Sequence, residues 1–159
     1  MMATSRTRVL FVCMGNICRS PLAEGVFLHK INQRGIADRF LVDSCGTGGW
    51  HAGERPDHRV LDLAKQRGIR LPSRARQIRD DDFTNFDHLL CMDEDNLALL
   101  IQQGGSNSKI RLLLDFDPQT QVREVPDPYY GGEDGFEEIY HLIDSATEAL
   151  LVELMQGRK

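Results

Sequence analysis

The stretch "RVLFVCMGNICRSPLAEGVFLHKINQRG" (residues 8–35) sets the architecture expected of this chain. Residues 8–13 form a short apolar run of branched and aromatic side chains, which is typical of a buried strand. Residues 21–35 follow with a helical pattern that opens on Pro21 and closes on Gly35, residue types that suit a first helical turn and a C-terminal cap. A strand that leads directly into a helix indicates a parallel sheet.

The same alternation of strand and helix continues along the chain. Further strands are predicted at residues 39–44, 86–92 and 110–116, and further helices at residues 56–68, 94–105 and 133–155. Such alternation predicts a parallel sheet with helices on both faces. Because no internal repeat, low-complexity tract or Pro/Ser linker interrupts it, we expect one α/β domain over residues 1–159 with a four-stranded parallel sheet.

Composition and charge exclude several classes of partner. The 159 residues are 41% hydrophobic and 27% charged, which is ordinary for a globular protein. A net charge of −5 argues against nucleic acid or an anionic membrane as partner. Asn16 and Arg19 interrupt the first apolar run too early for a signal peptide, and no run approaches the roughly 20 residues that span a bilayer. We therefore expect a cytoplasmic protein.

The four cysteines do not indicate a disulfide framework or a structural zinc site. Cys13 and Cys18 are close in sequence, but Cys45 and Cys91 are isolated, and the five histidines fall into no ligand spacing. We expect no metal. A nucleotide-binding loop of the Walker type is excluded as well, since no GxxxxGK[ST] pattern is present.

The loop "CMGNICRS" (residues 13–20) is the expected ligand site, because open α/β sheets bind ligands beyond the carboxyl ends of their strands. Gly15 and Asn16 tolerate the backbone angles that turn successive N–H groups inward. The helix that follows directs its free N–H groups and the positive end of its dipole to the same point. The loop therefore predicts a phosphate site that needs no metal.

Cys13 and Arg19 bracket this loop with the spacing C-x5-R, so that both ends can meet one phosphate. A thiol near a helix N-terminus and an arginine loses its proton easily, and the Ser20 hydroxyl can donate to the sulfur. Arg19 offers a planar fork for two phosphoryl oxygens. The alternative is a buried structural cysteine beside a surface arginine, and the position at a strand-to-helix turn favours the catalytic interpretation.

A nucleophile at phosphorus needs a general acid for its leaving group, and "EVPDPYYGG" (residues 124–132) offers Asp127. Two prolines flank this carboxylate and limit where it can point. Taken alone, an aspartate in a proline-rich turn is usually a turn former. Beside a phosphate loop, and followed by Tyr129 and Tyr130, the acid role is the favoured hypothesis.

These motifs resemble the low-molecular-weight protein tyrosine phosphatases, and the resemblance covers nearly the whole chain in order. It rests on "VLFVCMGNICRSPLAE" (9–24), "VDSCGTGGWHAGERPD" (42–57), "RARQI" (74–78), "FDHLLCMDEDN" (86–96) and "VPDPYYG" (125–131). The classical tyrosine phosphatases match less well, since they place His before the cysteine where this chain has Val12.

The resemblance implies a phosphotyrosine phosphatase that works without a cofactor. Cys13 would attack phosphorus to give a phosphocysteine intermediate, and Asp127 would protonate the tyrosine oxygen and then activate water. Arg19 and the loop would bind the phosphate. The loop residues implied are Met14, Gly15, Asn16, Ile17, Cys18 and Ser20.

Further roles follow from the same resemblance. Ser44 would hydrogen-bond Asn16 and support the loop, and Asp93 could support the same region. The walls of a slot for the aryl ring would be Trp50, Tyr129 and Tyr130. Ile17 favours phosphotyrosine, because members that resemble arginine phosphatases carry Thr at this place.

The resemblance also implies that Cys18 could form a disulfide with Cys13 that protects the nucleophile from over-oxidation. The alternative is that Cys18 only packs under the loop. Two departures from the family pattern are Ser73, where some members have a loop-ordering histidine, and Cys45, where alanine is common. The acidic run at residues 80–82 is expected to be a solvated helix start.

The expected partners are tyrosine-phosphorylated proteins and a cognate tyrosine kinase, and the expected state is a monomer with at most weak self-association. Three other functions stay open. An arsenate reductase would need closely spaced cysteines downstream, which this chain lacks; a phosphoprotein-binding module would not need the nucleophile and the acid; and phosphoarginine hydrolysis is the nearest alternative among enzymes.

Overall fold

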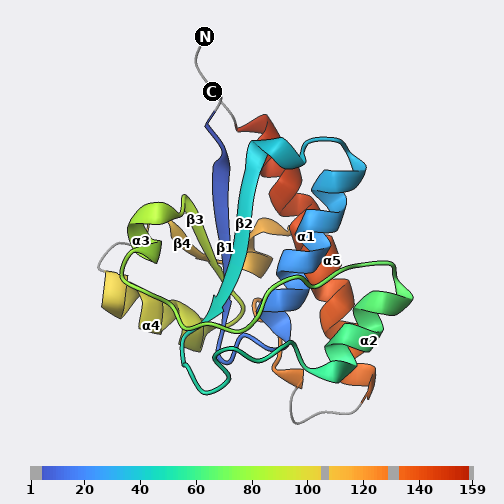
Figure 1. The fold of residues 1–159 in the computed structure, drawn as a ribbon. Helices are drawn as coiled ribbons and strands as arrows, with labels where there is room; N and C mark the ends of the chain where they lie inside the picture. The colour runs from blue at the N-terminus through green and yellow to red at the C-terminus, as the bar shows by residue number, and fades with distance from the viewer. Residues whose placement is uncertain (1–4, 105–107, 129–132, 158–159) are drawn as a thin grey trace.

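A parallel sheet of four strands forms the centre of the molecule (Figure 1). The computed structural model describes residues 5–104, 108–128 and 133–157. The strands are β1 (Thr7–Cys13), β2 (Phe40–Gly46), β3 (His88–Cys91) and β4 (Ile110–Leu112). They lie in the order β2-β1-β3-β4, and every pair is parallel, as the sequence predicts.

The strand order reverses direction at β1, which places the loop after β1 at the switch point of the sheet. From β1 the chain crosses to β2 on one side and later returns to β3 on the other. Val12 pairs with Cys45 of β2 and with Cys91 of β3, so β1 is hydrogen-bonded on both edges. Ligands of open α/β sheets bind at such points, beyond the carboxyl ends of the strands.

Helices cover both faces of the sheet and create two apolar cores (Figure 1). One face carries α1 (Arg19–Gln33), α2 (His58–Gln66) and α5 (Glu133–Gln156), and the other carries α3 (Asp82–Asn85) and α4 (Glu94–Gly104). Short 3₁₀ helices, η1 (Ala37–Arg39) and η2 (Leu113–Phe116), complete the described elements. No helix of the described residues has the length and apolar character that crossing a membrane would require.

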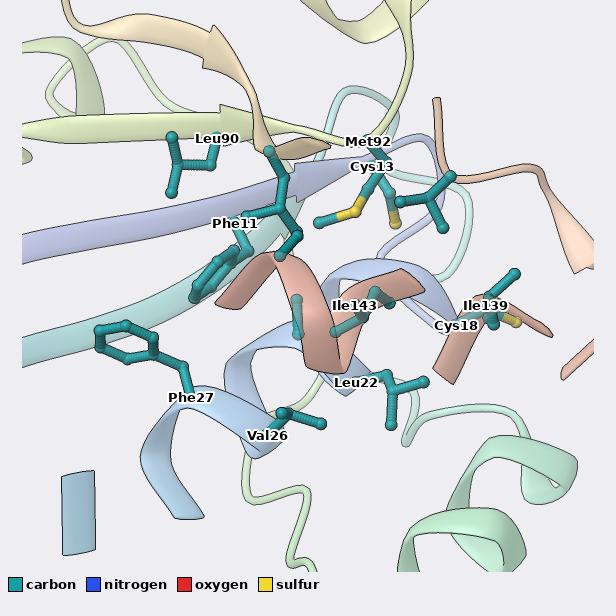
Figure 2. Close-up of a cluster of buried hydrophobic side chains, with 14 of the residues drawn as sticks. Phe11, Cys13, Cys18, Leu22, Val26, Phe27, Leu90, Met92, Ile139 and Ile143 are labelled. Atoms are coloured by element: carbon teal, nitrogen blue, oxygen red, sulfur yellow. The ribbon is translucent and has the colours of Figure 1, made fainter. Parts of the chain in front are cut away.

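The core between the sheet and α1 is built around aromatic rings (Figure 2). Phe27 of α1 lies 5.9 Å from Phe11 and 5.3 Å from Phe40, measured between ring centroids, and meets Phe40 edge to face. Leu22 and Val26 of α1 and Ile143 of α5 belong to the same apolar core as these rings. Because α1 follows the phosphate-loop candidate directly, this packing fixes where the loop ends.

The boundaries of several elements differ from those predicted. The predicted strand 110–116 ends at Leu112, and residues Leu113–Phe116 turn into η2. Helix α2 begins at His58 because the Asp57 side chain caps it by accepting a hydrogen bond from the Arg59 N–H. The expectation that residues 80–82 are solvated is wrong for Asp82, whose carboxylate is buried against Arg76.

Replacing Phe27 with alanine should lower the free energy of unfolding by about 3–5 kcal/mol, because it removes a fully buried ring and leaves a cavity between β1 and α1. Urea denaturation of the variant and the wild type measures this difference. Leu99→Ala on the exposed face of α4 is the control and should change stability by about 0.5 kcal/mol or less. Equal effects of the two substitutions would contradict this account of the core.

Candidate active site

A pocket of about 330 Å³ opens at the carboxyl end of β1, where the sequence places the ligand site. It is lined by Cys13, Met14, Gly15, Ile17, Cys18, Arg19, Trp50, His51 and Asp127. The structure thus brings together the predicted nucleophile, arginine and acid, which are up to 114 positions apart in sequence (127 − 13). Tyr129 and Tyr130, the other predicted walls, lie outside the described residues.

The loop between β1 and α1 turns its carbonyl groups outward. The carbonyl oxygens of Cys13, Met14 and Ile17 accept hydrogen bonds from N–H groups of the surrounding loops, and that of Cys18 accepts from within α1. In a planar peptide unit the N–H points opposite to the carbonyl. The N–H groups that follow these four carbonyls therefore face the interior of the loop, where they can surround an anion.

The loop packs directly on the end of β2, and this contact requires glycine at position 46. A Cβ built on Gly46 would lie 2.7 Å from the Met14 carbonyl oxygen and 3.1 Å from the Gly15 carbonyl carbon. Such distances are too short for a side chain. The close approach lets the N–H groups of Thr47 and Gly48 reach the carbonyls of Cys13 and Met14, at 2.9 and 3.0 Å.

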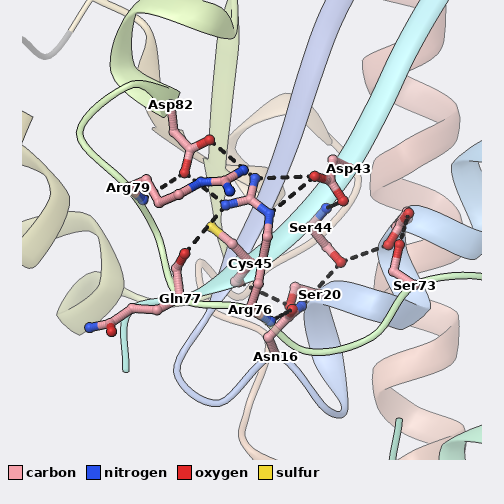
Figure 3. Close-up of polar contacts among 11 residues, drawn as sticks. Asn16, Ser20, Asp43, Ser44, Cys45, Ser73, Arg76, Gln77, Arg79 and Asp82 are labelled. Carbon is pink, nitrogen blue, oxygen red and sulfur yellow. Dashed lines mark hydrogen bonds and ion pairs between the residues drawn. The ribbon is translucent and has the colours of Figure 1, made fainter. Parts of the chain in front are cut away.

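The side chain of Asn16 holds the loop in this shape through hydrogen bonds (Figure 3). It has φ of 58°, the only positive value among the described residues other than glycine. Its Oδ1 accepts from the Arg76 backbone N–H at 3.0 Å, so its Nδ2 faces Ser20 and Ser44 and donates to their hydroxyls at 2.7 and 3.0 Å. The contact between Asn16 and Ser44 predicted from the family resemblance is present.

These contacts decide which way the hydroxyl protons point. Since Ser44 accepts from Asn16, its own proton goes to Glu24 Oε1 at 2.6 Å. Since Ser20 also accepts from Asn16, its proton is available to the Cys13 sulfur at 3.0 Å and to the Cys45 carbonyl oxygen at 3.3 Å. The Ser20 hydroxyl is thus placed as a donor that stabilises negative charge on the Cys13 sulfur.

Glu24 ends this network, and sequence reasoning assigned it no role. Its carboxylate is buried on α1, and its second oxygen accepts from the Ser73 hydroxyl at 2.6 Å. Burial raises the pKa of Glu24, and the hydrogen bonds from Ser44 and Ser73 lower it only in part. Ser73, where some relatives have histidine, therefore still supports the loop, through a neutral hydroxyl. The signal available in the sequence for such a role was a glutamate within the otherwise apolar stretch "PLAEGVF" (residues 21–27).

Arg76 fixes the segment that supports Asn16 (Figure 3). Its backbone carbonyl accepts from the Gly46 N–H at 2.8 Å, while its N–H binds Asn16. Its guanidinium makes two hydrogen bonds to Asp82, at 2.9 and 3.1 Å, and approaches Asp43 at 3.1 Å. A planar guanidinium held by two carboxylates leaves this segment little freedom to move.

Arg19 is buried and joins three loops of the site. Its Nη1 donates to Asp93 Oδ2 at 2.7 Å and to the Val125 carbonyl at 3.0 Å, and its Nη2 lies 3.8 Å from Asp127 Oδ2. Burial acts against its charge, but the Cys13 sulfur and Asp93 outweigh burial, so the pKa of Arg19 is raised. The guanidinium therefore stays charged beside the nucleophile. The support expected from Asp93 is present.

Asp127 reaches the pocket because its loop is tied to the sheet. The Val125 N–H donates to the Met92 carbonyl at 2.8 Å, which continues from the end of β3, and the Val125 carbonyl binds Arg19. Asp127 follows two residues later and lines the same pocket as Cys13. Its side chain is partly exposed, as the predicted role in proton transfer requires.

The second thiol of the loop has a different environment from the first. All four cysteines are free, so the disulfide between Cys13 and Cys18 stays a prediction. Burial first, and then the charge of Asp57, raise the pKa of Cys18 to about 12. Cys18 is therefore a neutral thiol in the pocket wall at physiological pH, while Cys45 and Cys91 are buried in the core on the far face of the sheet.

The chain is similar to known proteins over nearly its whole length. The family model described as "Low molecular weight phosphotyrosine protein phosphatase" matches residues 8–159. The low molecular weight phosphotyrosine protein phosphatase of Schizosaccharomyces pombe is 45% identical over 151 residues, which are 92% of this chain and 97% of that one.

Two solved structures have the same fold. YfkJ from Bacillus subtilis superposes with a TM-score of 0.94 at 36% identity, over 99% of this chain and all of that one (100%). The arginine phosphatase of Drosophila superposes with a TM-score of 0.86 at 35% identity, over 92% of this chain and 96% of that one. The fold is therefore shared by proteins named for two different phosphorylated residues.

Replacing Glu24 with glutamine should change stability in a pH-dependent way. A carboxyl with a raised pKa in the folded state favours folding while it is protonated, and this contribution is lost as the pH rises from its unfolded value, near 4.5, through its folded value. Glutamine does not titrate. The free energy of unfolding of Glu24→Gln minus that of the wild type should therefore increase over this range and then level off, as urea denaturation at several pH values would show.

Glu148→Gln is the matched control for this experiment. Hydrogen bonding to Arg34 lowers the pKa of Glu148, so its contribution to stability is present above its unfolded pKa and is lost as the pH falls. The difference between this variant and the wild type should therefore decrease with rising pH. The same slope for both variants would show that burial does not govern Glu24.

Proposed function

Since the chain belongs to the low molecular weight phosphotyrosine protein phosphatase family, we propose that it hydrolyses phosphotyrosine in proteins through a phosphocysteine intermediate. The observation that carries the proposal is the shared pocket of Cys13, Arg19 and Asp127, with the loop N–H groups turned toward it. A nucleophile, an anion cradle and an acid in one cavity are the parts that transfer of a phosphoryl group to an enzyme requires.

In the first step, the Cys13 sulfur attacks phosphorus in line with the bond to the tyrosine oxygen. The S–P bond forms as the P–O bond breaks, and Asp127 gives its proton to the departing phenolate oxygen. Arg19 and the inward N–H groups hold the three other phosphoryl oxygens, whose charge increases in the transition state. The Ser20 hydroxyl lies 3.0 Å from the sulfur and can donate a hydrogen bond to it during the attack.

In the second step, water replaces the tyrosine. Asp127, now a carboxylate, takes a proton from water, and the oxygen attacks phosphorus as the S–P bond breaks. Inorganic phosphate leaves and the thiolate is restored. Asp127 thus returns to its protonated form, and the cycle needs no cofactor.

Ile17 supports phosphotyrosine over phosphoarginine as substrate. It lines the pocket beside Cys13 and is buried apart from that edge, so it offers an apolar surface to an aryl ring. Trp50 provides a second apolar surface at the mouth. Phosphoarginine is the second candidate, because an arginine phosphatase is among the similar structures.

The cellular compartment proposed for the enzyme follows from its thiols. Cys13 works as a free thiolate, so a reducing compartment such as the cytoplasm suits it. The proposed partners are tyrosine-phosphorylated proteins and a cognate tyrosine kinase, met by a monomer. A disulfide between Cys13 and Cys18 is proposed as protection against irreversible oxidation.

Hydrolysis of a phosphotyrosine peptide in EDTA tests the proposal directly. Cys13→Ser should abolish turnover, because a hydroxyl replaces the thiolate nucleophile. Asp127→Ala should lower kcat by about 10²–10⁴-fold, the usual contribution of a general acid. Asp95→Ala, at an exposed position on α4, is the control and should retain wild-type turnover.

Phosphoarginine assayed in parallel separates the two candidate substrates. Turnover of phosphoarginine alone would replace phosphotyrosine as the substrate while leaving the Cys13 mechanism in place. Failure of both substrates would overturn the enzymatic proposal and favour a phosphate-binding module. Loss of activity in EDTA, restored by a metal, would contradict the mechanism.

A further inference from the structure

Glu124 opens the stretch "EVPD" (residues 124–127) that ends at the proposed acid, yet the two chemical steps do not use it. Within residues 121–126 only Val125 is buried, and all the others are exposed. A segment with so little buried apolar surface gains little rigidity from packing. The approach to Asp127 is therefore held mainly by polar contacts.

A groove of about 410 Å³ runs along one side of this approach. Glu124 and Pro126 line it from the loop, and Glu138 and Leu142 line it from α5. The groove keeps α5 away from the loop along this stretch. The contacts that fix the loop must therefore come from another element, and α4 is the one that Glu124 reaches.

Glu124 makes its contact with the first turn of α4. Its Oε2 accepts a hydrogen bond from the backbone N–H of Glu94, the first residue of the helix, at 2.8 Å. The first N–H groups of a helix have no partner within the helix, and the positive end of the helix dipole lies among them. A carboxylate at this place caps the helix and, because it comes from another segment, joins the loop to the helix.

The same helix end also holds the arginine of the site. Asp93, directly before α4, accepts from the Asn96 N–H at 2.8 Å through Oδ1 and from Arg19 Nη1 at 2.7 Å through Oδ2. Two carboxylates thus share the start of α4. One of them binds Arg19, and the other belongs to the loop that carries the proposed acid. The helix end therefore sets the position of the acid loop relative to the arginine.

The charged groups around Glu124 do not replace this hydrogen bond. The Glu94 carboxylate is a second negative charge nearby, and Arg123 offsets it, with Nη1 at 3.5 Å from Glu94 Oε1. Arg123 Nε also lies 3.6 Å from Asp115 Oδ1. Exposed ion pairs at such distances stabilise a structure only weakly. The short hydrogen bond from the Glu94 N–H is therefore the directional contact between this part of the loop and the helix.

We propose that Glu124 is a positioning residue: by capping α4 it holds the loop so that the Asp127 carboxyl meets the leaving oxygen of the substrate. The inference rests on the proposed function, because it concerns the step in which Asp127 protonates the departing phenolate. Glu124 is not among the described residues that line the pocket, so it acts on the substrate only through the backbone that leads to Asp127.

Two aryl phosphates of similar size test this inference. The phenolate of para-nitrophenyl phosphate departs readily without a proton, whereas that of phenyl phosphate depends on the general acid. The kcat/KM values cover the first phosphoryl transfer and the departure of the phenol. Their ratio, nitrophenyl over phenyl, therefore reports on proton transfer to the leaving group. Because both substrates meet the same enzyme, the folded fraction and the binding of the phosphoryl group cancel.

Glu124→Ala should raise this ratio by about 3- to 10-fold, the size expected for loss of a helix cap. Asp127→Ala removes the acid itself and should raise it further. Glu124→Gln keeps an oxygen that can accept from the Glu94 N–H, so its ratio should stay within about 2-fold of the wild type. Glu138→Ala is the matched control: it removes an exposed carboxylate from the other wall of the groove and should keep the wild-type ratio.

An unchanged ratio in Glu124→Ala would overturn the inference even if both activities fell, because a merely structural role lowers both substrates alike. An equal rise in Glu138→Ala would overturn it as well, since the charge of the groove would then be responsible rather than the cap. If Asp127→Ala leaves the ratio unchanged, the assignment of the acid fails and this inference fails with it. If the wild type hydrolyses neither substrate, the proposed function itself is wrong.

Discussion

The carboxamide of Asn16 is the constraint on which the rest of the site depends. It sits at a left-handed backbone position, and all its hydrogen-bonding groups are engaged, by Arg76 on one side and by Ser20 and Ser44 on the other. A buried amide that lost one of these partners would leave a polar group unsatisfied, at a cost of about 1–3 kcal/mol. Contacts within the protein therefore hold the N–H groups of the loop turned inward, which is the preorganisation that electrostatic catalysis needs.

Arg19 extends this order from the loop to the acid. Its guanidinium holds Asp93 at the start of α4, the carbonyl of Val125 and, at longer range, Asp127. Asp93 is itself fixed, because its other oxygen caps α4 by accepting from the Asn96 N–H. The side chain proposed to bind phosphate thus also contacts the segment that carries the proposed acid, Asp127. Ile17, Trp50 and His51 also line the pocket.

Much of this could be predicted from the sequence because the signals are local. Branched residues at 9–12 and the helical pattern after Pro21 predict β1 and α1, and the spacing from Cys13 to Arg19 predicts a loop that closes on an anion. The strand at 110–116 was predicted too long, because an apolar run does not distinguish a strand from the 3₁₀ turn of Leu113–Phe116. Asp82 was expected in solvent, because nothing in its neighbourhood in sequence shows that Arg76 packs against it.

The sequence by itself determined the class of fold and predicted Cys13, Arg19 and Asp127 as the candidate site residues, since each prediction rests on residue types at short spacing. Only the tertiary structure decided how they are supported. Glu24 comes from α1, Ser44 from β2 and Ser73 from a loop, and the two serine hydroxyls can donate to Glu24 only because folding brings these segments together. The same holds for His51, whose Nδ1 meets Glu54 and whose opposite edge lies against Gly15. Hydrogen-bond direction depends on distances between atoms, and residues remote in sequence acquire those distances only through folding.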